Sequence, residues 1–138
     1  MKKNFLSKLM SGLLVAALMT VGMSVHASLT QQTAMTRESD GTYVVNTSSL
    51  CQVKGYRSTT PLKIFIKGDK VVKVEALKNQ ETPKYFARVK NEVLPSWNGK
   101  AVKKAAKLKV NAVTGATLSS DAVMKNMKAG LEYYQKNK

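Results

Sequence analysis

Cysteine and histidine are almost absent from this sequence, which contains one of each in 138 residues. A single thiol, Cys51, excludes an internal disulfide and a cysteine zinc cluster. The single histidine, His26, falls within an N-terminal segment that has the features of a removable leader. A mature domain without imidazole cannot use a Ser-His-Asp or Cys-His mechanism, and it cannot form a histidine metal site. We therefore expect neither a catalytic residue of these types nor a metal. Cys51 falls in an apolar, strand-like segment, so we expect it to be a buried free thiol.

Acidic residues are also scarce, because 8 Asp and Glu stand against 23 Lys and Arg, a formal net charge of +15. Without the leader, 20 basic and 8 acidic residues remain, a net charge of +12. The basic residues are spread along the chain, and export would remove nucleic acid as a target, so we expect no nucleic-acid partner. The charge instead favours docking to an anionic membrane or to an acidic redox partner.

Residues 1–27 have the three parts of a signal peptide. Lysines at the start are followed by an apolar centre from Leu9 to about Met23, and the small residues Val25 and Ala27 flank a cleavage point. We expect cleavage after Ala27 and a soluble product in the periplasm or outside the cell. The alternative is an uncleaved anchor, but the uncharged run from residue 9 to residue 25 is shorter than the ~20 residues that span a bilayer.

Residues 28–39 have few apolar side chains and no clear period, which is typical of a flexible lead-in, and we expect the folded domain to occupy residues 40–138. Segments 42–46 and 50–56 are rich in β-branched and aromatic residues and predict two strands. Alternating Lys and Val or Ile on both sides of Gly68 predicts a β-hairpin over residues 62–77.

Helices are predicted in the second half of the chain. Thr82 can cap, and Pro83 can open, a helix that runs to about Val93. Residues 100–107 suit a short basic helix, and residues 108–113 suit a strand. The final helix is predicted from about residue 121 to residue 135. Its buried stripe should contain Val123, Met127, Gly130, Leu131 and Tyr134.

Together these elements predict an α+β domain, in which an antiparallel sheet of about five strands is accompanied by two or three helices. The chemistry is expected where Thr114-Gly115-Ala116-Thr117 joins the last predicted strand to the last helix. Free backbone N–H groups and the helix dipole suit a phosphate there, and Gly115 allows a close approach to the backbone. Taken by themselves, threonines and serines at the start of a helix are more often ordinary caps, and that interpretation is the commoner one for this junction.

The segment Val110-Asn111-Ala112-Val113-Thr114-Gly115-Ala116-Thr117-Leu118-Ser119-Ser120 resembles the flavin-attachment segment of the FMN-binding domain family. That family includes domains of the C subunit of sodium-translocating NADH:quinone reductase and the G subunit of Rnf complexes. Asp40-Gly41-Thr42-Tyr43, Gly55-Tyr56, Pro61-Leu62, the hairpin and Glu81-Thr82-Pro83 resemble the family in the same order, over about residues 40–135.

The resemblance implies that a flavin transferase, with FAD as donor, joins FMN through its phosphate to Thr117. It also implies that Glu81 and Thr82 contact the ribityl chain or the ring, and that Thr114, Gly115, Ala116, Leu118 and Ser119 form the attachment turn. One position departs from the family, because Asn111 stands where members usually have Asp, six residues before the acceptor. Because of this departure, one alternative stays open, namely that the chain is a family member that binds flavin weakly or not at all.

Aromatic side chains could flank the flavin ring. Tyr56, Tyr85 and Phe86 are expected to fill the core or its edge. Trp97 is the best candidate for a ring contact, since the polar Ser-Trp-Asn-Gly segment is a poor place to bury an indole.

The sequence therefore predicts an exported electron carrier with covalent FMN, rather than an enzyme with its own substrate. Its electrons would pass between a membrane electron-transfer complex and an extracytoplasmic redox partner. Two alternatives stay open, namely a small secreted reductase with noncovalent flavin and a basic binding module without a cofactor.

Overall fold

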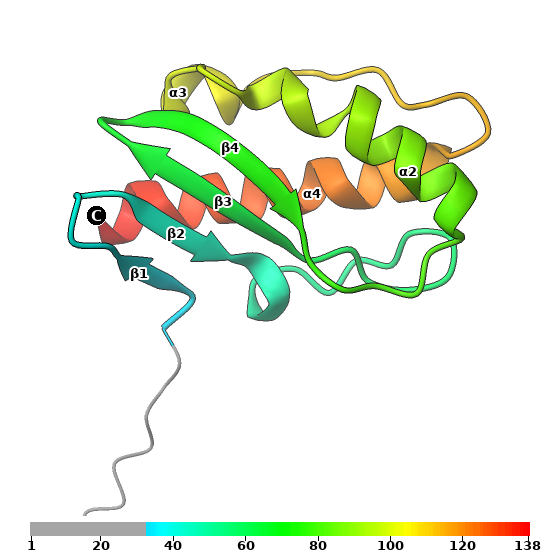
Figure 1. Cartoon of the computed structure of the whole chain (residues 1–138), viewed down its shortest axis with the longest axis horizontal. Helices are drawn as coiled ribbons and strands as arrows, with labels where there is room; N and C mark the ends of the chain where they lie inside the picture. Colours follow the sequence, from blue (N-terminus) through cyan, green and yellow to red (C-terminus); the bar gives the residue numbers. More distant parts are fainter. Residues whose placement is uncertain (1–32) are drawn as a thin grey trace, which may run out of the picture. The chain divides into compact units, whose positions relative to one another are not determined.

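The computed structural model describes residues 33–138, so the predicted signal peptide and residues 28–32 of the predicted lead-in lie outside the described residues. Within that part of the chain an antiparallel sheet has the strand order β1-β2-β3-β4 (Figure 1). The strands are β1 (Met35–Arg37), β2 (Tyr43–Asn46), β3 (Leu62–Lys67) and β4 (Lys70–Ala76).

Three α-helices and two short 3₁₀ helices complete the described chain. They are η1 (Thr47–Ser49), α2 (Pro83–Glu92), η2 (Leu94–Trp97), α3 (Val102–Ala105) and α4 (Thr117–Asn137). Helix α4 runs along one face of the sheet, where it contacts β2 and β3, while η2 and α3 contact β4 (Figure 1). The predicted α+β class is confirmed. No helix among residues 33–138 combines the length and the apolar character needed to cross a membrane.

The β3–β4 hairpin forms as its alternating pattern predicts. Leu62, Ile64 and Ile66 are buried on the face that meets α4, and the residues between them are more exposed. The turn places Gly68 and Asp69 at φ of +57° and +59°, the paired left-handed conformation of a type I′ turn. Such a turn matches the twist of the two strands, and it fixes their register.

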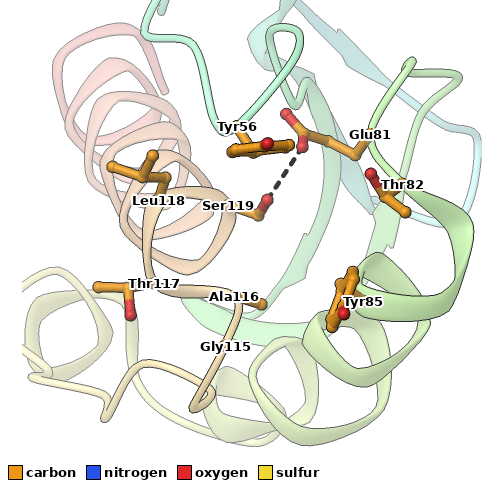
Figure 2. A pocket seen from close by; sticks show the side chains of 9 residues that line it. All are labelled: Tyr56, Glu81, Thr82, Tyr85, Gly115, Ala116, Thr117, Leu118 and Ser119. Atoms are coloured by element: carbon orange, nitrogen blue, oxygen red, sulfur yellow. Dashed lines mark hydrogen bonds between the residues drawn. The ribbon is translucent and has the colours of Figure 1, made fainter.

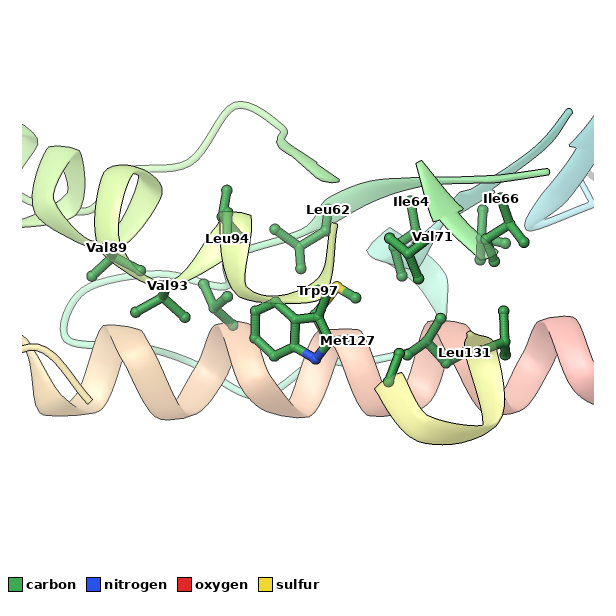
Figure 3. Packing of buried hydrophobic residues seen from close by; sticks show 14 of the residues in the cluster. Leu62, Ile64, Ile66, Val71, Val89, Val93, Leu94, Trp97, Met127 and Leu131 are labelled. Carbon is green, nitrogen blue, oxygen red and sulfur yellow. The ribbon is translucent and has the colours of Figure 1, made fainter. Parts of the chain in front are cut away.

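The core lies between the sheet and α4 (Figure 3). The predicted stripe of α4 is buried throughout, from Val123 to Tyr134. Trp97 is also in this core, with 1 % of its surface exposed, and it lies beside Met127 in Figure 3. The prediction of an exposed Trp97 was wrong, because the segment that contains it coils into η2 and turns the indole inward.

The C-terminal end of α4 is fixed to the hairpin turn. The Tyr134 hydroxyl donates to Asp69 Oδ1 at 2.6 Å, and Lys138 Nζ donates to the same oxygen at 2.7 Å. These contacts, that of Lys138 first, hold the pKa of Asp69 below its usual value. The helix is thus held at the end opposite to the predicted attachment turn.

The sheet has four strands in the described chain rather than about five, and the differences have physical reasons. Residues 50–56 form no strand, because the Cys51 N–H donates to Thr47 O and the Gly55 N–H donates to Ser58 O in local turns. Residues 108–113 form none either, since no neighbouring strand pairs with them. Strand β1 was not predicted, and its pairing with β2 places regular structure within the expected lead-in.

The predicted helices are present with shifted ends. Helix α2 begins at Pro83 as expected, but Thr82 occupies the N-cap position without a side-chain cap hydrogen bond. Helix α3 covers only part of the predicted segment 100–107. Helix α4 begins at Thr117, four residues before the predicted start, so the attachment turn is shorter than the sequence suggested.

Gly130 is required where α4 crosses the sheet. A Cβ at this position would meet Ile64 Cδ1 and would lie 2.9 Å from Thr47 Cγ2. We predict that Gly130→Ala lowers the free energy of unfolding by about 1–3 kcal/mol through overpacking, even though alanine favours a helix. Urea denaturation measures the change. The exposed substitution Lys136→Ala on the same helix should stay within about 0.5 kcal/mol of the parent, and an equal loss in both variants would contradict the close packing.

Candidate functional site

A cavity of about 450 Å³ opens where the start of α2, the start of α4 and the loop before β3 meet (Figure 2). It brings together residues that are far apart in the sequence. Seven of the nine predicted site residues line it, and two tyrosines complete the lining. The lining consists of Tyr56, Glu81, Thr82, Tyr85, Gly115, Ala116, Thr117, Leu118 and Ser119.

A tight turn delivers the chain into the start of α4. Gly115 has a φ of +83°, and the Ala116 N–H donates to Val113 O at 2.9 Å. The Ser120 hydroxyl holds the turn from within the helix, because it donates to Ala116 O at 2.8 Å and accepts the Val113 N–H at 3.1 Å. The left-handed conformation at position 115 favours glycine, which gives this residue a structural role besides the close approach predicted from the sequence.

The start of α4 carries no side-chain cap. Ala116 occupies the N-cap position and has no oxygen with which to cap, and Thr117 is already the first helical residue. The interpretation of these threonines and serines as ordinary caps is therefore wrong. The first backbone N–H groups of a helix lack intrahelical acceptors, and with the helix dipole they attract an anion.

Thr117 is exposed at the edge of the cavity, so its hydroxyl is accessible to a second protein (Figure 2). Thr114 is exposed as well but does not line the cavity. Its carbonyl accepts a hydrogen bond of 3.0 Å from Arg88 Nη1, which joins α2 to the turn. The two threonines of the predicted motif thus have different surroundings.

A buried carboxylate holds the cavity together. Glu81 is 5 % exposed, and its Oε2 accepts the Ser119 hydroxyl at 3.0 Å (Figure 2). Its Oε1 accepts the backbone N–H groups of Arg57 at 3.1 Å and Ser58 at 3.0 Å. Two of the donors belong to the loop before β3 and the third belongs to the first turn of α4. The carboxylate therefore connects these two segments.

Gly55 allows the loop to approach this carboxylate. A Cβ at position 55 would lie 2.5 Å from Glu81 Oε1 and 3.1 Å from the Ser119 Cα, which leaves no room for a side chain. The Gly55-Tyr56 pair of the family resemblance thus has a structural reason. Glycine lets the loop fold onto Glu81, and the next residue then lies at the cavity.

Exposed apolar surface gathers around the cavity. Tyr56 is 72 % exposed, Leu118 57 % and Tyr85 45 %, and all three line it. Such a concentration of exposed apolar side chains marks a binding surface. Phe86 is buried in the core, as expected. The other aromatic assignments are corrected, because Trp97 is buried in the core, whereas Tyr56 and Tyr85 lie at the cavity. The period of α2 could have shown this for Tyr85, which lies off the stripe that buries Phe86 and Val89.

The lone thiol lies apart from this site. Cys51 is a buried free cysteine, as predicted, and it does not line the cavity.

We predict that Glu81→Ala disorders the loop before β3, because the Arg57 and Ser58 N–H groups lose their acceptor. Each hydrogen bond to a charged group contributes about 1.5–3 kcal/mol, so the free energy of unfolding should fall by at least that amount. Hydrogen exchange at the two amides reports the local effect. In Ser119→Ala, which removes only one of the contacts, both amides should exchange nearly as slowly as in the parent. Unchanged exchange in Glu81→Ala would contradict the role of the carboxylate.

The residues that line the cavity fall within a match to a known protein family. The sequence model of the FMN-binding domain matches residues 55–132, more than half of the chain and the whole of the cavity lining. The resemblance inferred from the sequence is thereby confirmed. No curated protein matches the chain.

Proposed function

The chain belongs to the FMN-binding domain family, and from this premise we propose that it is an exported flavoprotein with FMN esterified to Thr117. We propose further that it carries electrons between a membrane donor and an extracytoplasmic acceptor. The observation that supports the attachment is the position of Thr117, which is exposed on the first residue of an uncapped helix at the edge of a cavity. The signal-peptide pattern of residues 1–27 supports export.

The residues present fit FMN. The volume of about 450 Å³ falls within the range of about 300–1,000 Å³ that is usual for ligand pockets. Tyr56, Tyr85 and Leu118 offer apolar surface to a planar ring. The backbone N–H groups at the start of α4 offer donors to a phosphate. The family resemblance assigns seven of the lining residues to this role.

When bound, FMN supplies the redox chemistry, and the protein contributes binding and orientation. This division of labour suits a chain whose described residues include no histidine and a single thiol away from the cavity. Glu81 keeps the Tyr56 loop and the first turn of α4 in place, and the exposed Leu118 adds apolar surface to the cavity lining. The covalent tether would prevent loss of the cofactor by dilution outside the cell.

Attachment requires a partner enzyme. The Thr117 hydroxyl forms a bond to the phosphorus of FAD that bears the riboflavin, the pyrophosphate bond breaks, AMP leaves and the hydroxyl proton passes to a base or to solvent. A metal-containing flavin transferase can activate both groups. The domain itself needs only to present an accessible oxygen, and the exposed first residue of α4 does so.

Asn111 is compatible with this role. The residue is exposed six positions before Thr117, in the segment that leads to the turn. It is outside the cavity lining, so the missing carboxylate would affect recognition by the transferase rather than the site that receives the flavin. We expect slower attachment than in family members that have Asp there, with the same final product.

We predict that co-expression of the full chain with a flavin transferase adds the mass of FMN less one water. The protein band should fluoresce in a denaturing gel. Thr117→Ala should abolish both signals because it lacks the acceptor oxygen, and Thr117→Ser should retain them. Intact-mass analysis measures the result.

Thr114→Ala is the matched control, since this threonine is exposed in the same turn but does not line the cavity. It should be modified like the parent. A modified Thr117→Ala would assign the ester to another hydroxyl. Yellow colour that leaves with the supernatant on acid precipitation would indicate noncovalent flavin, and a colourless, unmodified parent would leave only a basic binding module.

A further inference from the structure

A second cavity, of about 420 Å³, lies between α4 and the segment that follows α3. Its walls are apolar, and Leu108, Val110 and Met124 are half-buried there against the core. Trp97 and Met127 form its buried base. Methionine side chains adapt readily to the shape of an inserted group. We refer to this cavity as the lysine-rimmed groove.

The rim of the groove is positively charged. Lys109, Lys125 and Lys128 are exposed around it, and Asp121 is the one acidic residue that lines it. The wider segment of residues 100–128 contains seven lysines and one acidic residue, so it holds half of the net charge of +12 that the mature chain carries. None of the four ion pairs found among residues 33–138 involves these lysines. Their charge is therefore available to an acidic partner.

The backbone beside the groove is unpaired. Residues 108–112 alternate between half-buried and exposed positions, as a strand does, yet they belong to no sheet. Within the described chain, the N–H groups of Lys109, Val110, Asn111 and Ala112 donate to no protein acceptor. In Figure 1 the chain crosses from α3 to the start of α4 here without forming a helix or a strand. An open, strand-like edge of this kind can pair with an added strand.

We propose that the lysine-rimmed groove docks an extended acidic segment of the redox partner. The backbone of that segment pairs with residues 109–112, one of its apolar side chains enters the groove, and its carboxylates meet the rim lysines. A protein segment fits better than a membrane surface, because the apolar side chains here are recessed and half-buried rather than protruding. The inference rests on the proposed function, which supplies the reason for a redox partner.

The groove is close to the proposed flavin. Lys125 follows Thr117 by eight residues on the same helix, which is about 12 Å along its axis at 1.5 Å per residue. The unpaired segment ends at the turn that enters the cavity. A partner docked here would lie near the start of α4, where we propose that the flavin is attached.

The test uses the full chain, expressed with a flavin transferase, purified and labelled with ¹⁵N. The probe is a synthetic seven-residue peptide of alternating Glu and Leu. We expect its binding to shift the amide resonances of residues 109–112 and of Met124, and to weaken as salt is added. A Gln-Leu peptide of the same length should bind more weakly, because it lacks the carboxylates. Shifts spread evenly over all exposed lysines would overturn the proposal.

A charge-matched pair of variants tests the location. Lys125→Glu combined with Lys128→Glu should weaken peptide binding by at least about tenfold, since it places like charges opposite the carboxylates. Lys78→Glu combined with Lys90→Glu makes the same change at exposed lysines away from the groove and should alter binding by less than about twofold. Equal losses in both double variants would overturn the proposed location.

Two further outcomes distinguish a failure of the docking proposal from a failure of the proposed function. Peptide binding at the groove by a chain that carries no flavin would support the docking surface and remove the proposed function. A flavin-loaded chain that ignores the peptide would overturn the docking surface alone. Vesicles containing anionic phospholipid are the competing probe, and binding to them in the absence of peptide binding would assign the groove to a membrane instead.

Discussion

The carboxylate of Glu81 is the contact on which the site depends. It is buried, and it accepts hydrogen bonds from the loop before β3 and from the first turn of α4. A buried acceptor of this kind is costly unless its donors are in place, so the carboxylate favours the arrangement in which both segments lie against it. Gly55 makes the approach possible, since any side chain there would collide with the carboxylate. The shape of the cavity that we propose for the flavin therefore depends on this polar cluster as well as on the apolar core.

Helix α4 is anchored at both of its ends. Its first turn is tied to Glu81 and its last turn to Asp69 in the hairpin, while the stripe between them fills the core beneath the sheet. The outer side of the same helix borders the lysine-rimmed groove. One helix thus connects the proposed cofactor site and the proposed docking surface. The redox role that we propose requires few reactive side chains, because a cofactor would provide the reaction and the fold its position.

The sequence predicted the elements that follow from local pattern. The hairpin around Gly68, the Pro83 helix and the buried stripe of α4 all formed as periodicity and turn chemistry require. The strands expected at residues 50–56 and 108–113 did not form, because the first segment makes local turns and the second pairs with no strand of the sheet. The prediction for Trp97 was wrong because its burial also depends on distant parts of the chain. Helix η2 turns the indole toward the core, which no local sequence pattern shows. Family resemblance found most of the cavity lining, whereas the contact between Glu81 and Ser119, 38 residues apart, could come only from the structure.

The most direct test of the account is to locate the flavin on the protein from its native host. Trypsin cleaves after Lys109 and Lys125 and releases residues 110–125, which contain Thr114, Thr117, Ser119 and Ser120. Fragmentation of this peptide by tandem mass spectrometry should place the mass of FMN, less one water, on Thr117 alone. An unmodified peptide, or a flavin on any other hydroxyl, would contradict the assignment of the first residue of α4 as the attachment point.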